Sequence, residues 1–69
     1  MINVYVVWIV DGPVMTTLLQ YPDTPESKIM IANLTSDQIV SHAKDVEEVE
    51  QDASYELAAI FTGNIEFIY

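Results

Sequence analysis

Eight residues near the middle of the chain, "DVEEVEQD" at 45–52, contain five carboxylates, and the only histidine, His42, stands three residues before them. Carboxylates and imidazole bind divalent metals and transfer protons in general acid–base catalysis. His42, Asp45 and Glu48 are spaced by threes, so adjacent pairs can share a ligand, but on a helix the three spiral and do not converge. The chain also lacks the "DxDxDG" calcium loop and the "HExxH" zinc pattern. We therefore predict no metal site and no cofactor.

Catalysis is the second kind of chemistry that these residues suggest, because paired carboxylates can act as acid and base. A chain of 69 residues rarely encloses a pocket on its own, however. The sequence has no cysteine, no Gly-rich phosphate loop and no cofactor motif, and its serines lie in no nucleophile arrangement. We predict that the protein is not an enzyme and that it acts by binding.

The charge of the chain limits what it can bind. Two lysines face eleven acids, which gives a formal net charge of -9. Nucleic acids and anionic membranes need Lys and Arg opposite phosphate, so we predict neither as a direct partner. The apolar run "INVYVVWIV" at 2–10 is well short of the roughly 20 residues that span a bilayer. We expect a cytoplasmic protein whose natural complement is a basic protein surface.

One helix is well specified at its start. Thr35 can be the N-cap and Gln38 stands three residues later, as a capping box requires, while Leu34 and Ile39 occupy the positions of a hydrophobic staple. Apolar residues then recur with a helical period, which predicts a helix over about 36–51. The period continues as far as "FTG" at 61–63, so a single helix reaching Gly63 is an alternative. His42 borders the apolar stripe, and we expect it to be half-buried with a structural role.

This helix would carry an arc of carboxylates opposite its apolar stripe. An ordinary solvated helix face mixes Glu with Lys, and this one does not, so we weigh a partner-binding surface equally against a solvated face. The residues predicted to bind a partner are Asp37, Asp45, Glu48 and Asp52, with Glu47 at the margin.

Two β-hairpins complete the predicted fold. The runs at 2–10 and 14–21 are rich in β-branched and aromatic residues, and "DGPV" between them supplies a turn. Gly63-Asn64 marks a second turn, between "AAIFT" and "IEFIY". We predict a loop at 22–27 and allow a short strand at 28–32. The predicted fold class is α+β: one domain, 1–69, in which an antiparallel sheet of two hairpins (2–21 and 55–69) packs on one helix at about 36–51.

Such a sheet leaves one face without a helix, and we expect aromatic residues there, namely Tyr5, Trp8, Phe67 and Tyr69. They can pack against a second copy, which makes a self-associating structural or regulatory subunit the alternative function. Trp8 and the tyrosines also allow a third function, the capture of a small molecule.

In size, acidity, lack of cysteine and sheet-plus-helix pattern, the chain resembles the small proteins that bacteriophages make to disable host enzymes. Anti-CRISPR and anti-restriction inhibitors are examples, and some of them are DNA mimics. The resemblance implies a stoichiometric inhibitor without a catalytic site. The leading expectation is thus an acidic binding protein that occupies a basic, nucleic-acid-binding surface of a larger host protein and inhibits it.

Overall fold

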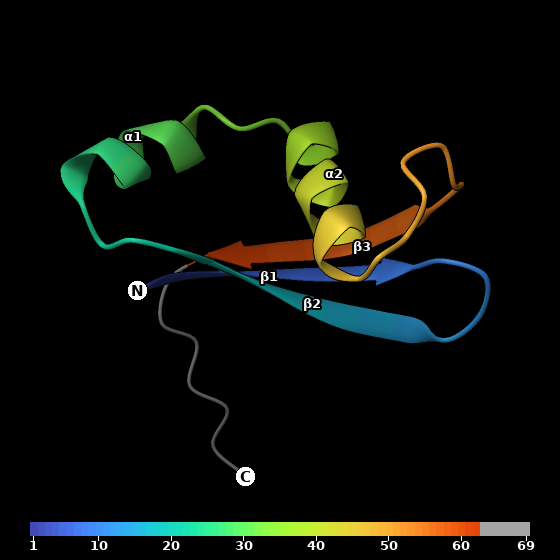
Figure 1. Cartoon of the computed structure of the whole chain (residues 1–69). Helices are drawn as coiled ribbons and strands as arrows, with labels where there is room; N and C mark the ends of the chain where they lie inside the picture. The colour runs from blue at the N-terminus through green and yellow to red at the C-terminus, as the bar shows by residue number, and fades with distance from the viewer. Residues whose placement is uncertain (63–69) are drawn as a thin grey trace, which may run out of the picture.

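The chain folds as one three-stranded antiparallel sheet with two helices on the same side of it (Figure 1). The computed structural model describes residues 1–62. The sheet has the order β2-β1-β3, so the N-terminal strand lies in the middle. This arrangement confirms the α+β class. The elements are β1 (Ile2–Ile9), β2 (Val14–Tyr21), α1 (Pro25–Ala32), α2 (Ser36–Val46) and β3 (Glu56–Thr62).

The N-terminal hairpin forms as predicted. β1 and β2 pair from Ile2 with Tyr21 to Ile9 with Val14. The turn between them contains Asp11 and Gly12 at φ values of 50° and 148°. Side chains with a Cβ rarely adopt these angles, and Gly and Asp are among the residues that do so at least cost. The "DGPV" sequence therefore sets the register of the hairpin.

The core lies between the sheet and α2. Side chains alternate across a strand, so Val4, Val6 and Trp8 of β1 share one face. All three are buried, together with Leu19 of β2 and three residues of α2, Ile39, Val40 and Ala43. The expectation that Trp8 lies on the uncovered face was wrong, because its position in β1 has the same parity as Val4 and Val6.

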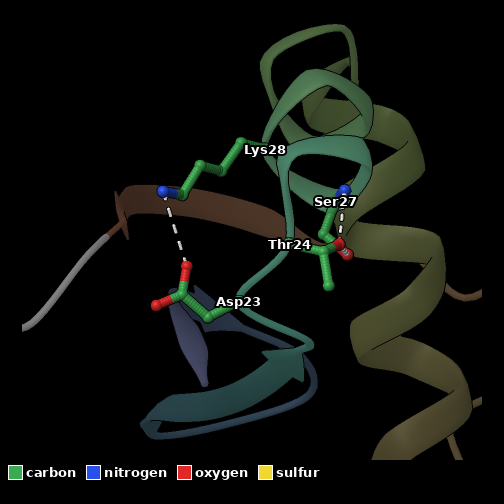
Figure 2. Close-up of polar contacts among 4 residues, drawn as sticks. All are labelled: Asp23, Thr24, Ser27 and Lys28. Atoms are coloured by element: carbon green, nitrogen blue, oxygen red, sulfur yellow. Dashed lines mark hydrogen bonds and ion pairs between the residues drawn. The ribbon is translucent and has the colours of Figure 1, made fainter.

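Residues 25–32 form the helix α1, which corrects the predicted loop and short strand. Thr24 is the N-cap: its Oγ1 accepts a hydrogen bond from the Ser27 N–H at 3.2 Å (Figure 2). Pro25 follows in the first turn, where its missing N–H is not needed, and Glu26 interacts favourably with the helix dipole. The sequence "TPES" is thus a helix start, although its proline also suits a loop.

The predicted start of α2 at Ser36 and its capping box are confirmed. The Gln38 N–H donates to Thr35 Oγ1 at 3.2 Å, and the Thr35 N–H donates to Gln38 Oε1 at 2.8 Å. These two bonds are the predicted capping box.

The end of α2 lies at Val46, five residues before the predicted one. Glu48 adopts a left-handed conformation, with φ at 58°. The Val49 N–H donates to the Lys44 carbonyl at 2.8 Å, and the Glu48 N–H donates to the Asp45 carbonyl at 3.3 Å. This is a Schellman motif, which usually has glycine at the left-handed position. Because a glutamate at this position does not signal a helix end, the apolar period predicted a helix that is too long.

The third strand settles the choice between a long helix and a strand after residue 52. β3 pairs antiparallel with β1, with a shift of register between Val7 and Trp8. The first strand of the predicted closing hairpin is therefore present. Its second strand, with Phe67 and Tyr69, lies outside the described residues.

Candidate functional site

The acidic segment, residues 45–52, comprises the last two residues of α2 and the chain that follows it. The sequence analysis predicted that these carboxylates lie along one continuous helix. In the structure the helix ends at Val46, and the chain reverses direction at Glu48. Four of the predicted partner-binding residues lie in this segment: Asp45, Glu47, Glu48 and Asp52. Asp37 lies at the other end of α2, in its first turn.

The buried side chain of Lys44 binds the backbone of the acidic segment and of the residue after it. Its side chain is only 4% exposed. Its Nζ donates to the carbonyls of Gln51 at 2.9 Å and Ala53 at 2.8 Å, and it lies 4.8 Å from the centre of the Tyr55 ring. An ammonium with two carbonyls and an aromatic face is well compensated for its burial. Lys44 therefore fixes the backbone of the loop by binding its carbonyl groups.

Gln51 ties the same loop to the outer side of α2. Its amide Nε2 donates to the Ser41 carbonyl at 2.9 Å and to Asp45 Oδ1 at 2.7 Å. Its Oε1 accepts from the Ser41 hydroxyl at 2.7 Å. These three bonds, with those of Lys44, give the segment a defined shape. The carboxylates of the acidic segment thus project from an ordered scaffold.

Glu47 is connected to the core. The indole N–H of Trp8 donates to Thr17 Oγ1 at 2.9 Å, and the Thr17 hydroxyl donates to Glu47 Oε1 at 3.0 Å. Trp8 and Thr17 are both completely buried. The relay satisfies the indole N–H and anchors the end of α2 on the sheet. Glu47 therefore has a structural role, which the sequence did not predict for it.

Three carboxylates of the acidic segment are exposed and, within residues 1–62, make no hydrogen bond or ion pair: Glu48, Glu50 and Asp52. Glu50 was not among the predicted residues, because a helix through residue 51 would turn it into the apolar stripe. The early end of α2 exposes it instead. Sequence patterns alone carry no signal for this change.

Counter-charges are scarce around these carboxylates. In the described part of the chain, the one ion pair joins Lys28 Nζ to Asp23 Oδ1 at 3.5 Å, at the start of α1 (Figure 2). Lys44 has only backbone carbonyls and an aromatic ring around its ammonium. Exposed anions without a cation in contact keep a strong local potential at low ionic strength.

Asp37 has a different partner. Its Oδ1 accepts a hydrogen bond from the Tyr55 hydroxyl at 2.8 Å. This bond, with desolvation and the negative charge of Asp37, raises the pKa of Tyr55 above its ordinary value of 10.0. Asp37 therefore stabilises the link between α2 and the residue before β3, and it lies apart from the acidic segment.

His42 is exposed, which corrects the half-buried expectation. Its Nδ1 shares a hydrogen bond of 2.7 Å with the Tyr21 hydroxyl, and the two rings meet edge to face. Asp45 and Glu48 do not converge with it: residues 1–62 contain no group of three side chains suited to hold a metal ion.

A cleft of about 390 Å³ lies between α1 and the ends of β1 and β3. Its walls are Ile2, Lys28, Ile31, Ala32 and Thr62. None of these described lining residues is aromatic, and Trp8 is completely buried elsewhere. Within residues 1–62, neither Trp8 nor any of the tyrosines behind the small-molecule alternative lines the cleft.

The fold and the site together define a small α+β protein with a preorganised anionic surface. Comparison with protein families, with curated proteins and with solved structures finds no match for the chain. Neither α1 nor α2, the helices of residues 1–62, has the length and apolar character needed to cross a membrane.

Proposed function

We propose that this protein binds a basic surface of a larger protein through the acidic segment and inhibits that protein by occupying the surface. The partner is a protein whose Lys- and Arg-lined groove otherwise binds nucleic acid, so the acidic segment acts as a nucleic-acid mimic. Such a protein has no catalytic step of its own. The proposal includes a cytoplasmic location, where nucleic-acid enzymes are at work.

The observation that carries the proposal is the ordered backbone beneath three exposed carboxylates. Lys44 and Gln51 fix the loop through five hydrogen bonds. None of these bonds uses the carboxylates of Glu48, Glu50 or Asp52, which lie exposed at the surface. Because the backbone of the loop is already fixed, binding through these side chains requires no further ordering of the loop. An ordinary solvated face needs no such scaffold.

The conformation of Glu48 gives independent support. A residue with a Cβ in the left-handed region is about 1 kcal/mol less stable than glycine there. Glycine is the usual residue at this position of a Schellman motif. A glutamate at a position that favours glycine suggests that its carboxylate has a use other than stability.

The experiment is a pull-down from a lysate of the host, with the full-length tagged protein washed at about 50 mM and again at about 500 mM salt. Two double variants are compared, each of which changes the net charge from -9 to -7. Glu48→Gln with Asp52→Asn removes two charges from the acidic segment. Asp23→Asn with Glu26→Gln removes two from the start of α1 and is the matched control.

We expect a nucleic-acid-binding protein to be captured at low salt and lost at high salt. The first double variant should lose it, whereas the control should retain it. Equal capture by both variants would show that the acidic segment is a solvated surface. Equal loss in both would show that net charge, and no particular surface, determines capture.

A further inference from the structure

The face of the sheet that carries no helix is largely apolar. On its central row, Leu18 of β2, Tyr5 of β1 and Phe61 of β3 are direct cross-strand neighbours. Leu18 is 42% exposed and Phe61 47%, and Val14 at the end of β2 is 58% exposed. Val7 and Ile9 of β1 share this face, and Ile9 is the cross-strand neighbour of Val14. Large apolar side chains with this exposure, gathered on one face, mark a contact surface.

Within residues 1–62, charges are almost absent from this face. Of the residues that the three strands direct there, Glu56 alone is charged, and it lies at the first position of β3. The acidic segment follows α2, and both helices lie on the opposite side of the sheet (Figure 1). Two copies with a charge of -9 each repel one another through most of their surface, but least through this face.

We infer that a second copy of this chain covers the open face, so that the protein forms a sheet-on-sheet homodimer. A charged partner would bury its charges against apolar side chains, at a high cost in desolvation. The face therefore requires a partner surface that is apolar and uncharged, and the chain itself presents one. This inference uses a different surface from the acidic segment and does not depend on the proposed function.

The central row is self-complementary. A two-fold axis parallel to β1 would bring β2 of one copy against β3 of the other. Leu18 would then face Phe61 of the second copy. An isologous contact of this kind is the commonest arrangement of homodimers. Packed sheets stand about 10 Å apart, which is the distance that such side chains fill.

The size of the face predicts a reversible dimer. Three strands about 4.8 Å apart, with seven or eight residues at about 3.3 Å each, cover about 350 Å² in projection. Interfaces of standard size bury about 800 Å² per partner. We therefore expect a weak dimer whose dissociation constant lies between about 10 μM and about 1 mM.

The test is sedimentation equilibrium of the full chain, from low micromolar to about millimolar concentration, at about 50 mM and about 500 mM salt. We expect the dimer to be at least about tenfold tighter at the higher salt, because salt screens the repulsion between the two copies. Binding through the acidic segment has the opposite salt dependence, so the two proposals succeed or fail separately.

Leu18→Glu places two like charges within the contact and should weaken the dimer by at least about a hundredfold. The matched control is Met30→Glu on α1, since Met30 is 45% exposed and lies off the face. It adds the same charge and should leave the dimer within about threefold of the parent. Circular dichroism checks that both variants fold.

A chain that stays monomeric up to about millimolar concentration at both salt concentrations would overturn the inference, and residues 63–69 or another protein would then be what covers the face. A dimer that Leu18→Glu leaves intact, or that Met30→Glu disrupts equally, would overturn it as well.

Discussion

At the scale of single residues, the two lysines of the chain have unlike roles. Lys28 makes an exposed ion pair with Asp23, whereas Lys44 is buried and binds two backbone carbonyls. Exposed ion pairs contribute little to stability, and buried hydrogen bonds from a charged donor contribute much more. The stability of the acidic segment therefore depends on Lys44.

Lys44→Met should lower the free energy of unfolding by about 2–3 kcal/mol, because it leaves the carbonyls of Gln51 and Ala53 without their donor. Urea denaturation measures the loss, and amide hydrogen exchange should show faster exchange in residues 49–54. Lys28→Met removes the same charge and should change stability by less than about 0.5 kcal/mol. Similar losses in the two variants would contradict the role given to Lys44.

The hydrogen bonds from Trp8 to Thr17 and from Thr17 to Glu47 also contribute to stability. Thr17→Val keeps the volume but leaves the buried indole N–H without an acceptor, so we expect a loss of about 1–3 kcal/mol. Thr16→Val, on the exposed face of the same strand, should have an effect within about 0.5 kcal/mol. Thermal unfolding followed by the fluorescence of Trp8 measures both. An unchanged midpoint in Thr17→Val would rule out the relay as a stabilising element.

The ionisation of Tyr55 should make the stability of the protein depend on pH above pH 10. Its hydrogen bond to Asp37 raises its pKa above 10.0, so the stability due to protonated Tyr55 is present below pH 10.0 and is lost as the pH rises through the folded-state pKa. Asp37→Asn should lower the pKa of Tyr55. The tyrosinate absorbance of each protein, compared with that of its Tyr55→Phe derivative, follows this group alone. Burial raises the pKa of Tyr21, which should stay unchanged in Asp37→Asn and serves as the control.

At the scale of elements, the sequence predicted what local chemistry determines. The capping box at Thr35 and the "DGPV" turn are complete within a few residues, and both are present. The loop after α2 is held by Lys44, which binds carbonyls seven and nine residues further along the chain. No periodic pattern reports such a contact, and for that reason Glu50 was missed. α1 was missed because a proline opens it and none of its residues is buried.

Glu48→Gly should raise the free energy of unfolding by about 0.5–1 kcal/mol, because glycine adopts the left-handed conformation without strain. Glu50→Gly removes the same charge at a position without positive φ and should destabilise by a similar amount. Chemical denaturation measures whether each variant raises or lowers the free energy of unfolding. A destabilised Glu48→Gly would show that the Glu48 side chain stabilises the fold, and would remove that support for its use in binding.

At the scale of the whole molecule, the structure separates two surfaces. The acidic segment lies at the end of α2, on the helix side, and the apolar face lies on the other side of the sheet. The two are independent, since a dimer formed through the open face leaves both acidic segments exposed. Each dimer would then offer two anionic surfaces to a partner, which increases the avidity for a target with repeated basic sites.

The measurement that tests the central claim most directly is the affinity of the parent protein for its captured partner at several salt concentrations, beside the two double variants. We predict that affinity falls steeply as salt rises, and that Glu48→Gln with Asp52→Asn weakens it by at least about tenfold, or about 1.4 kcal/mol. Asp23→Asn with Glu26→Gln should stay within about twofold of the parent. An affinity that is insensitive to salt, or that both double variants weaken equally, would contradict binding through the acidic segment.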